Sequence, residues 1–510
     1  MQGTADPNRE LLDAAALCQH LVEPGSVAEF LGKHRGQLFP DELFADLFPS
    51  GKGRPSVPAD VIASVMVMQS LEGLSDRDAA RQLRTNIAWK VATGRALDDP
   101  GFHPTVLTLW RNKLRASNRP KRIFEAVQEV VKATGVISGR ARRVLDSTVL
   151  DDAVTRQDAI MQLVAQIRKV RRMIPQAAAL ELKAHPYDTD AGKPACAWND
   201  RADIERVVTE LITDAKTVLA EVAPLKLNDE QAEAVGLLAL VAEQDVEPGD
   251  TDGSWRIARR TAKDRMVSVH DPASRHVHKT NHNYRDGFKA HLAAEPVTGL
   301  ITAYDLTAGN VGDAQAAPGL LAGEEGPLEV QGDGAYGSGA FREHLDQQGH
   351  TAVIKPIPLM PAIPGGFTVD DFVIDLDAKT AMCPAEWVVP IIGKRKQYAK
   401  FGVHCADCPL RQRCTASSTG RTVSIHPQHK RMRAAREQAR TPAFQEAYRQ
   451  FRPMAERTIA WFVRKGNRRV PYRGIARNMI WLGHRSAGVN LKRLLNLGLA
   501  ATPTGGWVVF

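Results

Sequence analysis

Apolar side chains recur at helical spacing through roughly the first 135 residues of the chain. Ser75, followed three positions later by Asp78, is typical of a helix N-cap, and Gly73 just before it is typical of a helix end. The predicted helices cover residues 57–71, 75–83, 87–91 and 104–114. We therefore expect residues 1–135 to form an all-helical N-terminal domain.

The next segments combine one short strand with a second helical region. Residues 144–150 form a β-branched run that predicts a strand with Val144, Asp146 and Thr148 on one face. Helical spacing then returns from about 155 to 243, with Asn228 and Gln231 suited to cap its last helix. We expect residues 155–250 to be a helical insertion that ends in a linker.

From residue 285 the pattern alternates between strands and helices. The predicted strands cover 286–293, 300–306, 328–331 and 351–355, with a hairpin turn at 295–299 and a helix at 338–347. A proline-rich boundary at 356–366 and a basic helical region from about 429 to 499 follow. This order predicts an α/β fold with a mixed sheet.

The composition is that of an ordinary globular protein with several units, since 43% of the 510 residues are hydrophobic and 25% are charged. No apolar stretch approaches the length of a membrane span, and the first residues lack the basic-then-apolar order of a secretory signal. We therefore expect a cytoplasmic protein without a membrane partner.

Charge is distributed unevenly along the chain. The whole chain carries +9, but residues 391–510 hold 24 Lys and Arg against four acids, whereas the other 390 residues hold 43 against 54. Such a basic block is typical of a protein that binds nucleic acid, the alternative being a solvated basic face. Because a solvated face normally mixes acids among its cations, we favour nucleic acid.

Four of the six cysteines lie close together, in the order Cys383-x21-Cys405-x2-Cys408-x5-Cys414. Without a secretory signal, such a cluster favours metal over disulfides, and Cys-x2-Cys lets two thiolates bind one Zn²⁺ tetrahedrally. We expect residues 367–428 to be a small zinc-ribbon-like insertion with a structural zinc ion. Reduced buried thiols are the alternative, and His404 or His426 would be substitutes for one cysteine.

Three acidic residues stand in unusual contexts. Asp146 lies within a predicted strand, Asp333 directly follows another strand, and Glu456 lies in the basic helical region. Carboxylates brought together hold hard divalent cations, and a pair of such cations activates a nucleophile and stabilises the leaving oxygen of a phosphodiester. Spacing alone does not single out these three among 58 acidic residues.

The order of several short motifs resembles that of the bacterial insertion-sequence DDE transposases, which have a ribonuclease-H-like catalytic fold. The resemblance spans about residues 30–500. It rests on Leu-Asp146-Ser-Thr, Asp333-Gly-Ala-Tyr336 and the helical set Tyr448, Arg452 and Glu456. The family's hairpin is resembled by residues 286–291 with 298–299. Its helical N-terminal domain is resembled by residues 73–76 with 102–105, and its C-terminal end by residues 490–494.

The resemblance implies a ribonuclease-H-like catalytic domain over residues 136–510, interrupted by the two insertions. It implies that Asp146, Asp333 and Glu456 hold two Mg²⁺ or Mn²⁺ ions. It also implies that Tyr448 and Arg452 contact DNA beside the catalytic glutamate.

The chain departs from the family pattern Tyr-x2-Arg-x3-Glu-x6-Lys at two places. The tyrosine position is occupied by Arg449, one residue after Tyr448, and the lysine position by Val463, with Arg464 and Lys465 just beyond.

Basic residues surround Glu456 in the sequence and are expected to contact DNA phosphates. The nearest that we assign to DNA are Arg464, Lys465, Arg468 and Arg469. Trp461 and Tyr472 lie among them. Each would either stack on an unpaired base or pack in the core. A His-rich patch, which we interpret as a polar loop rather than a metal site, consists of His270, Asp271, His276, His278 and His282.

We therefore expect a DNA transposase that cleaves and joins an insertion-sequence element by a two-metal DDE mechanism. Its partners would be double-stranded DNA, at terminal inverted repeats and at the target. Synapsis of two ends implies a homodimer on DNA, at the nucleoid. Two alternatives stay open: a metal-dependent nuclease without strand transfer, and a domesticated, non-catalytic zinc-containing DNA-binding protein.

Overall fold

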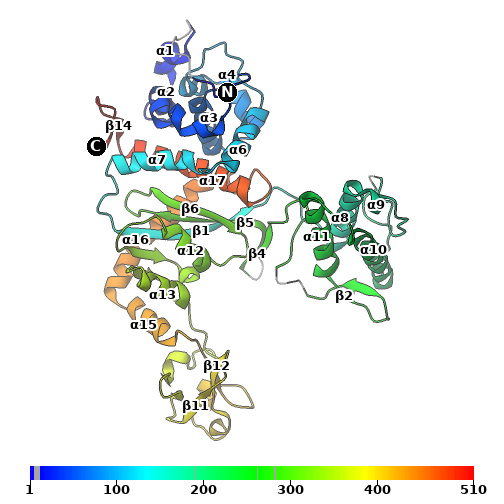
Figure 1. Ribbon diagram of the computed structural model, residues 1–510. Coiled ribbons are helices and arrows are strands. Elements are labelled where there is room, and N and C mark those ends of the chain that lie inside the picture. The colour runs from blue at the N-terminus through cyan, green and yellow to red at the C-terminus, as the bar shows by residue number, and fades with distance from the viewer. Residues whose placement is uncertain (5–11, 190, 261, 263, 281–282) are drawn as a thin grey trace.

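The computed structural model describes residues 1–4, 12–189, 191–260, 262, 264–280 and 283–510. Its N-terminal region is helical, as predicted (Figure 1). The helices are α1 (Ala14–Cys18), α2 (Val27–Leu38), α3 (Ala59–Glu72), α4 (Asp76–Thr85), α5 (Ile87–Thr93), α6 (Thr105–Ala116) and α7 (Arg122–Ala133), with 3-10 turns at Gln19–Leu21 and Asp41–Leu47. Ser75 caps α4 by accepting a hydrogen bond from the Asp78 amide, as the sequence predicts.

Six strands form the central mixed sheet. They are β1 (Arg142–Asp151), β4 (Arg275–Thr280), β5 (Asn283–Ala294), β6 (Ile301–Ala308), β7 (Glu329–Gly332) and β8 (Thr351–Ile354). The order is β4-β5-β1-β7-β8, with β6 also paired to β5. β5 is antiparallel to β1 and β6, whereas β7 is parallel to β1 and β8. This is the strand order of a ribonuclease-H-like core, which confirms the predicted fold class.

Helices cover both faces of this sheet (Figure 1). On one face, α12 (Asp313–Leu321) and α13 (Gly339–Gln347) pack on Leu145 and Ala293. On the other face, Leu292 and Leu306 belong to a large core that includes the N-terminal helices and α17 (Ile475–Asn496). Helix α17 contacts α3, α7 and β6, so it joins the N-terminal domain to the sheet.

The basic C-terminal region is helical, as predicted, and consists of three helices. They are α15 (His429–Ala439), α16 (Pro442–Phe462) and α17, followed by the short hairpin β14 (Leu499–Ala501) and β15 (Trp507–Val509). Pro453 lies within α16 and does not end it. A loop at 463–474 separates α16 from α17. No helix among the described residues is long and apolar enough to cross a bilayer.

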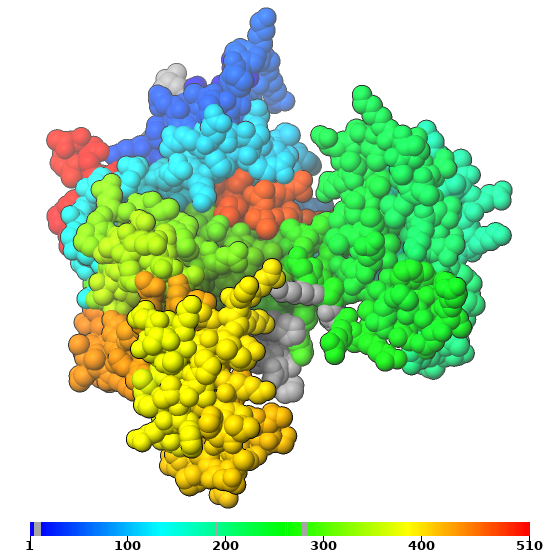
Figure 2. Space-filling model, turned by 60° about the horizontal axis from the view of Figure 1, so that its bottom comes forward, coloured from blue at the N-terminus to red at the C-terminus, as the bar shows by residue number. Residues whose placement is uncertain are grey.

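Two lobes project from this body (Figures 1 and 2). The first has its own apolar core and holds α8 (Ala159–Met173), α9 (Pro175–Ala178), α10 (Arg201–Val222) and α11 (Asp229–Gln244). Asn228 and Gln231 form the expected capping box of α11. The predicted linker differs: residues 249–254 connect two paired strands, β2 (Val246–Pro248) and β3 (Trp255–Ile257).

The second lobe contains the cysteines and a five-stranded sheet. Its elements are β9 (Val373–Asp375), β10 (Thr380–Met382), β11 (Val388–Ile392), β12 (Gln397–Lys400), β13 (Thr422–Ile425), α14 (Arg411–Cys414), and 3-10 turns at Val369–Asp371 and Gly402–Cys405. A further 3-10 turn, Gly334–Tyr336, follows β7 in the central sheet. Helix α15 contacts α13, so it lies against the sheet body just after this lobe in the chain.

Candidate active site

Asp146 and Asp333 lie side by side on one face of the sheet. Strands β1 and β7 are parallel neighbours, and Val144 is paired with Gln331. Each aspartate comes two residues after one of these paired residues, so both side chains belong to the same face as their partners. Asp146 lies within β1, whereas Asp333 directly follows β7 and caps the next turn by accepting from the Ala335 amide.

Helix α16 packs over the same face and places Arg452 between the two aspartates. Phe451 and Ala455 of α16 pack against Val144 of β1, which fixes the helix on the strand. Nη2 of Arg452 lies 3.0 Å from Oδ1 of Asp146 and 3.8 Å from Oδ2 of Asp333. Nη1 donates to the Leu145 carbonyl at 2.8 Å. The guanidinium is therefore buried against the carboxylates rather than exposed.

Glu456 and Tyr448 lie one helical turn to either side of Arg452. At spacings of four residues the three side chains follow one face of α16, and Glu456 is exposed. The Tyr448 ring stacks on Phe444, with ring centres 5.8 Å apart. Burial raises the pKa of the Tyr448 hydroxyl, and the charges of Asp333, Asp146 and Glu456 raise it further. Tyr448 thus lies within reach of the charges of all three carboxylates.

Burial makes this region costly for negative charge. It raises the pKa of Asp146, which the neighbouring Arg452 guanidinium partly offsets. The Tyr336 phenol is fully buried, and its pKa is raised chiefly by burial and then by Asp313, Asp146 and Asp333. A neighbouring cation therefore favours the ionised form of Asp146, and Arg452 is such a cation.

The residue types suit a hard divalent cation, since all three candidate ligands are carboxylates. In the part of the chain that the structure describes, no group of three or more His, Cys, Asp or Glu side chains is arranged to hold a metal ion. Arg452 lies between Asp146 and Asp333, where it supplies the positive charge that a metal would also supply.

The loop after α16 brings further cations to the same strand. Arg468 Nη1 lies 3.4 Å from the Thr148 hydroxyl, on the face of β1 that carries Asp146. The loop is held there because the Asp151 amide donates to the Arg468 carbonyl, and Arg469 Nε donates to the Asp152 carbonyl. The other two predicted DNA contacts, Arg464 and Lys465, are exposed nearer the N-terminal domain.

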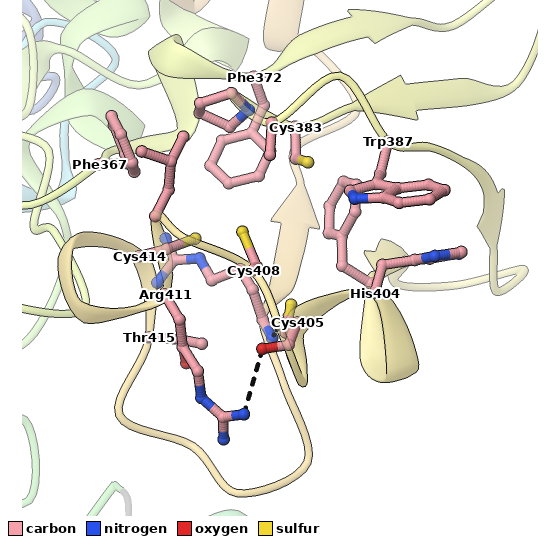
Figure 3. A pocket seen from close by; sticks show the side chains of 15 residues that line it. Phe367, Phe372, Cys383, Trp387, His404, Cys405, Cys408, Arg411, Cys414 and Thr415 are labelled. Atoms are coloured by element: carbon pink, nitrogen blue, oxygen red, sulfur yellow. Dashed lines mark hydrogen bonds between the residues drawn. The ribbon is translucent and has the colours of Figure 1, made fainter.

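The four clustered cysteines surround a single small space in their lobe. Figure 3 shows the thiols of Cys383, Cys405, Cys408 and Cys414 around this space, which measures about 20 Å³, enough for one water-sized sphere. All four are free thiols. Burial raises the pKa of the Cys414 thiol, and the other three cysteines raise it further.

Of the two candidate histidines, His404 also lines this space and His426 does not. The His404 ring stacks on Trp387, with ring centres 4.4 Å apart, beside the thiols (Figure 3). His426 accepts from the Gln428 amide and does not line the space. The candidate ligand set is therefore the four cysteines.

The aromatic and histidine candidates have other surroundings. Tyr472 donates to Asp76 at 3.3 Å and packs under Arg111, so it is not placed to stack on a base. Trp461 lies 4.7 Å from the Arg493 guanidinium and is half-buried. His276 lies in β4, where the sequence analysis expected a loop, and contacts Asp286. His282 and the His278 side chain lie outside the described residues.

One structural residue was missed by sequence reasoning. Arg485 of α17 is 2% exposed, and its guanidinium donates to backbone carbonyls at the end of α3 and the end of α16. A signal exists, because an arginine within the apolar run Trp-Leu-Gly-His-Arg-Ser-Ala is unusual for an exposed position. It ties the N-terminal domain to the helix that carries Glu456.

Comparisons with known proteins match both ends of the chain. A family model described as a transposase DDE domain matches residues 382–495, which contain Glu456 and Arg452. A second, described as Transposase domain (DUF772), matches residues 19–113 of the helical N-terminal domain. No curated protein and no solved structure matches the chain. With the mixed sheet and the helical N-terminal domain, these two matches indicate an insertion-sequence DDE transposase.

Proposed function

We propose that the protein cleaves DNA at the ends of an insertion-sequence element and joins the freed 3′ ends to target DNA. We assign Asp146, Asp333 and Glu456 as the ligands of two Mg²⁺ or Mn²⁺ ions. The observation that carries this proposal is the meeting of two aspartates from adjacent parallel strands with the helix that bears Glu456. A DDE transposase family in general implies DNA binding and dependence on divalent metal ions, which supports this proposal.

Two bound cations would supply an activated nucleophile, first water and then a 3′-hydroxyl, and would stabilise the leaving oxygen. The residues of the chain do the rest. The buried Arg452 orients the Asp146 carboxylate through its hydrogen bond and offsets the charge of both aspartates. Arg468, held at Thr148, offers a cation for the phosphate that approaches Asp146 along the same face.

DNA is the proposed partner throughout. Tyr448, Arg464, Lys465 and Arg469 would contact the strand near the catalytic helix, while the N-terminal domain helps to recognise terminal inverted repeats. Synapsis of two element ends calls for a homodimer on DNA. Because its substrate is chromosomal DNA, we expect the protein to act in the cytoplasm, at the nucleoid.

We also propose a structural Zn²⁺ held by the four cysteines of the second lobe. The donor set fits, since four thiolates suit tetrahedral zinc and leave no position open for chemistry. The thiols converge on a space that is walled by aromatic rings, among them Phe372 and Phe401. The lobe has short strands and a small core, so a bound metal ion would add to its stability.

A strand-joining assay separates the proposed function from its alternatives. The substrate is a DNA duplex whose end has the sequence that flanks the gene, with a label at its 3′-hydroxyl end. It is incubated with the protein, Mg²⁺ and a target plasmid. We expect label to appear in the plasmid. Cleavage without joining would leave a metal-dependent nuclease as the function.

The Asp333→Ala variant tests the catalytic assignment in the same assay. We expect it to lose cleavage by at least 1,000-fold, on the order of the loss seen when a group acting only in the transition state is removed. DNA binding should stay within a few-fold of the unmodified protein. Unchanged cleavage would remove Asp333 from the site, and binding without cleavage by the unmodified protein would favour the non-catalytic alternative.

A further inference from the structure

A groove of about 660 Å³ runs between the N-terminal domain and the end of the catalytic helix. The start of α2 and the end of α3 form one wall, and Trp461 of α16 with the loop residues Arg464 and Lys465 forms the other. Buried apolar side chains, Met68 and Val489 among them, lie at its base. Its size falls within the range of about 300–1,000 Å³ that is usual for ligand sites.

The rim of this groove is rich in cations. Arg464 and Lys465 come from the loop after α16, and Lys492 and Arg493 come from α17. Within the described residues, none of the four forms an ion pair with an acid. Other cations of the basic block do, as Arg436 does with Asp370 at 2.5 Å.

Two acids also line the groove but do not cancel its charge. Glu72 accepts a hydrogen bond from the Trp89 indole at 3.1 Å, and Glu23, just before α2, is exposed. Four cations against two acids leave the rim positive. Arg493 is held over the Trp461 ring by donating to the Thr298 carbonyl at 2.6 and 2.9 Å, so its charge has a fixed position.

The groove is built rigidly rather than left between loosely packed parts. The buried Arg485 guanidinium donates to the carbonyls of Ser70, Leu71, Phe462 and Trp461, which clamps both walls together. Gly73, with φ 68°, ends α3 where an added Cβ would overlap the Lys465 carbonyl. Lys465 itself has φ 56°, a left-handed backbone that is strained for a non-glycine residue.

We propose that this groove binds the sugar–phosphate backbone of the DNA strand that passes through the active site, with Lys465 and Lys492 contacting phosphates. The proposal rests on the proposed function and adds a second place where the protein contacts the DNA strand. Helix α16 connects the two sites: Trp461 follows Glu456 by five residues, about 7.5 Å along the helix axis. A strand whose phosphate lies at Glu456 thus reaches the groove within a few nucleotides.

The test measures salt-dependent binding of the full-length protein to a fluorescein-labelled duplex of about 30 base pairs, since phosphate contacts need no particular sequence. The double variant Lys465→Ala/Lys492→Ala is compared with Arg172→Ala/Lys226→Ala, which removes two exposed cations from the helical lobe. Each phosphate contact contributes about 0.9 to the slope of log affinity against log salt concentration. We therefore expect the magnitude of this slope to fall by about 2 for the groove variant and to stay unchanged for the control.

An unchanged slope for the groove variant, or the same loss in the control, overturns the proposal. Should the groove variant fold poorly, lysine acetylation of the unmodified protein gives the answer: DNA should protect Lys465 and Lys492, and equal labelling with and without DNA contradicts the proposal. The two ideas fail separately. If DNA binding depends on the groove but the unmodified protein shows no metal-dependent cleavage, the proposed function fails and the proposal that the groove binds DNA stands.

Discussion

Arg452 is an internal counter-charge for the candidate active site. It contacts Asp146 and Asp333 and donates to the Leu145 carbonyl, and its side chain is only 10% exposed. Replacing it with methionine would leave a buried aspartate without its partner. We expect Arg452→Met to lower the free energy of unfolding by about 3 kcal/mol, as for other broken buried pairs.

Urea unfolding measures this loss, and Arg449→Met provides the matched control. Arg449 is three residues earlier on the same helix, where it pairs with Glu446 while both side chains are largely exposed. Its replacement should change stability by less than about 0.5 kcal/mol. Equal effects of the two variants would show that Arg452 is not an internal counter-charge.

His484 makes stability depend on pH. Burial at the seam between α17 and the N-terminal domain lowers its pKa from 6.5 to about 3, and Arg111 adds to this. The unfolded chain keeps the ordinary value, so unfolding takes up a proton between these pH values. Stability contributed by neutral His484 is therefore full above pH 6.5 and falls as the pH falls, by about 1.4 kcal/mol per unit.

Denaturation of His484→Gln at pH 7 and pH 5 checks this account. The stability difference between the two pH values should be smaller in the variant by about 2 kcal/mol, because one proton-linked group is gone. A variant with the same pH dependence as the unmodified protein would mean that His484 is protonated in the fold.

At the scale of elements, the cysteine lobe depends most on a single proposed interaction. We expect Cys405→Ser/Cys408→Ser to lose one zinc ion per chain and to melt at a lower temperature, because the short strands β9–β13 enclose only a small core. Zinc content by mass spectrometry and thermal unfolding measure both effects. Cys196→Ser, outside the cluster, serves as the control, and unchanged zinc content in the double variant would rule out the zinc site.

Elements with strong local signals were predictable from the sequence. The capped helices α4 and α11 and the hairpin of β5 and β6 carry turn and capping residues at fixed offsets, which act over a few positions. Helix α12 was missed because Pro318 and Gly319 lie within it and weaken its helical pattern. The three-residue strands of the cysteine lobe are too short to show a period.

At the scale of the whole molecule, motif order selects candidate residues but does not reveal how they meet. Asp146, Asp333 and Glu456 could be chosen from motif order, and the adjacency of the two aspartates follows from the parallel pairing of β1 and β7. The position of Arg452 between those aspartates could not be predicted, because it depends on how α16 docks across strands some 300 residues earlier. Packing between distant segments leaves no local pattern.

The structure shows which residues of the basic block form ion pairs. Part of the basic block is neutralised by acids from elsewhere in the chain, as Lys430 is by Asp377 and Arg431 by Asp346. Arg468 instead lies beside Thr148, and Arg464, Lys465, Lys492 and Arg493 line the groove. We propose that DNA passes along these cations.

The most direct measurement of the central claim is a crystal structure of the full-length protein with Mn²⁺, read from anomalous scattering. We predict two Mn²⁺ peaks about 3.5–4 Å apart, bound by Asp146, Asp333 and Glu456, and the loss of these peaks in Asp146→Asn crystals. Mn²⁺ bound elsewhere, or peaks that persist at this site in Asp146→Asn crystals, would contradict the assignment of these three carboxylates as the catalytic metal ligands.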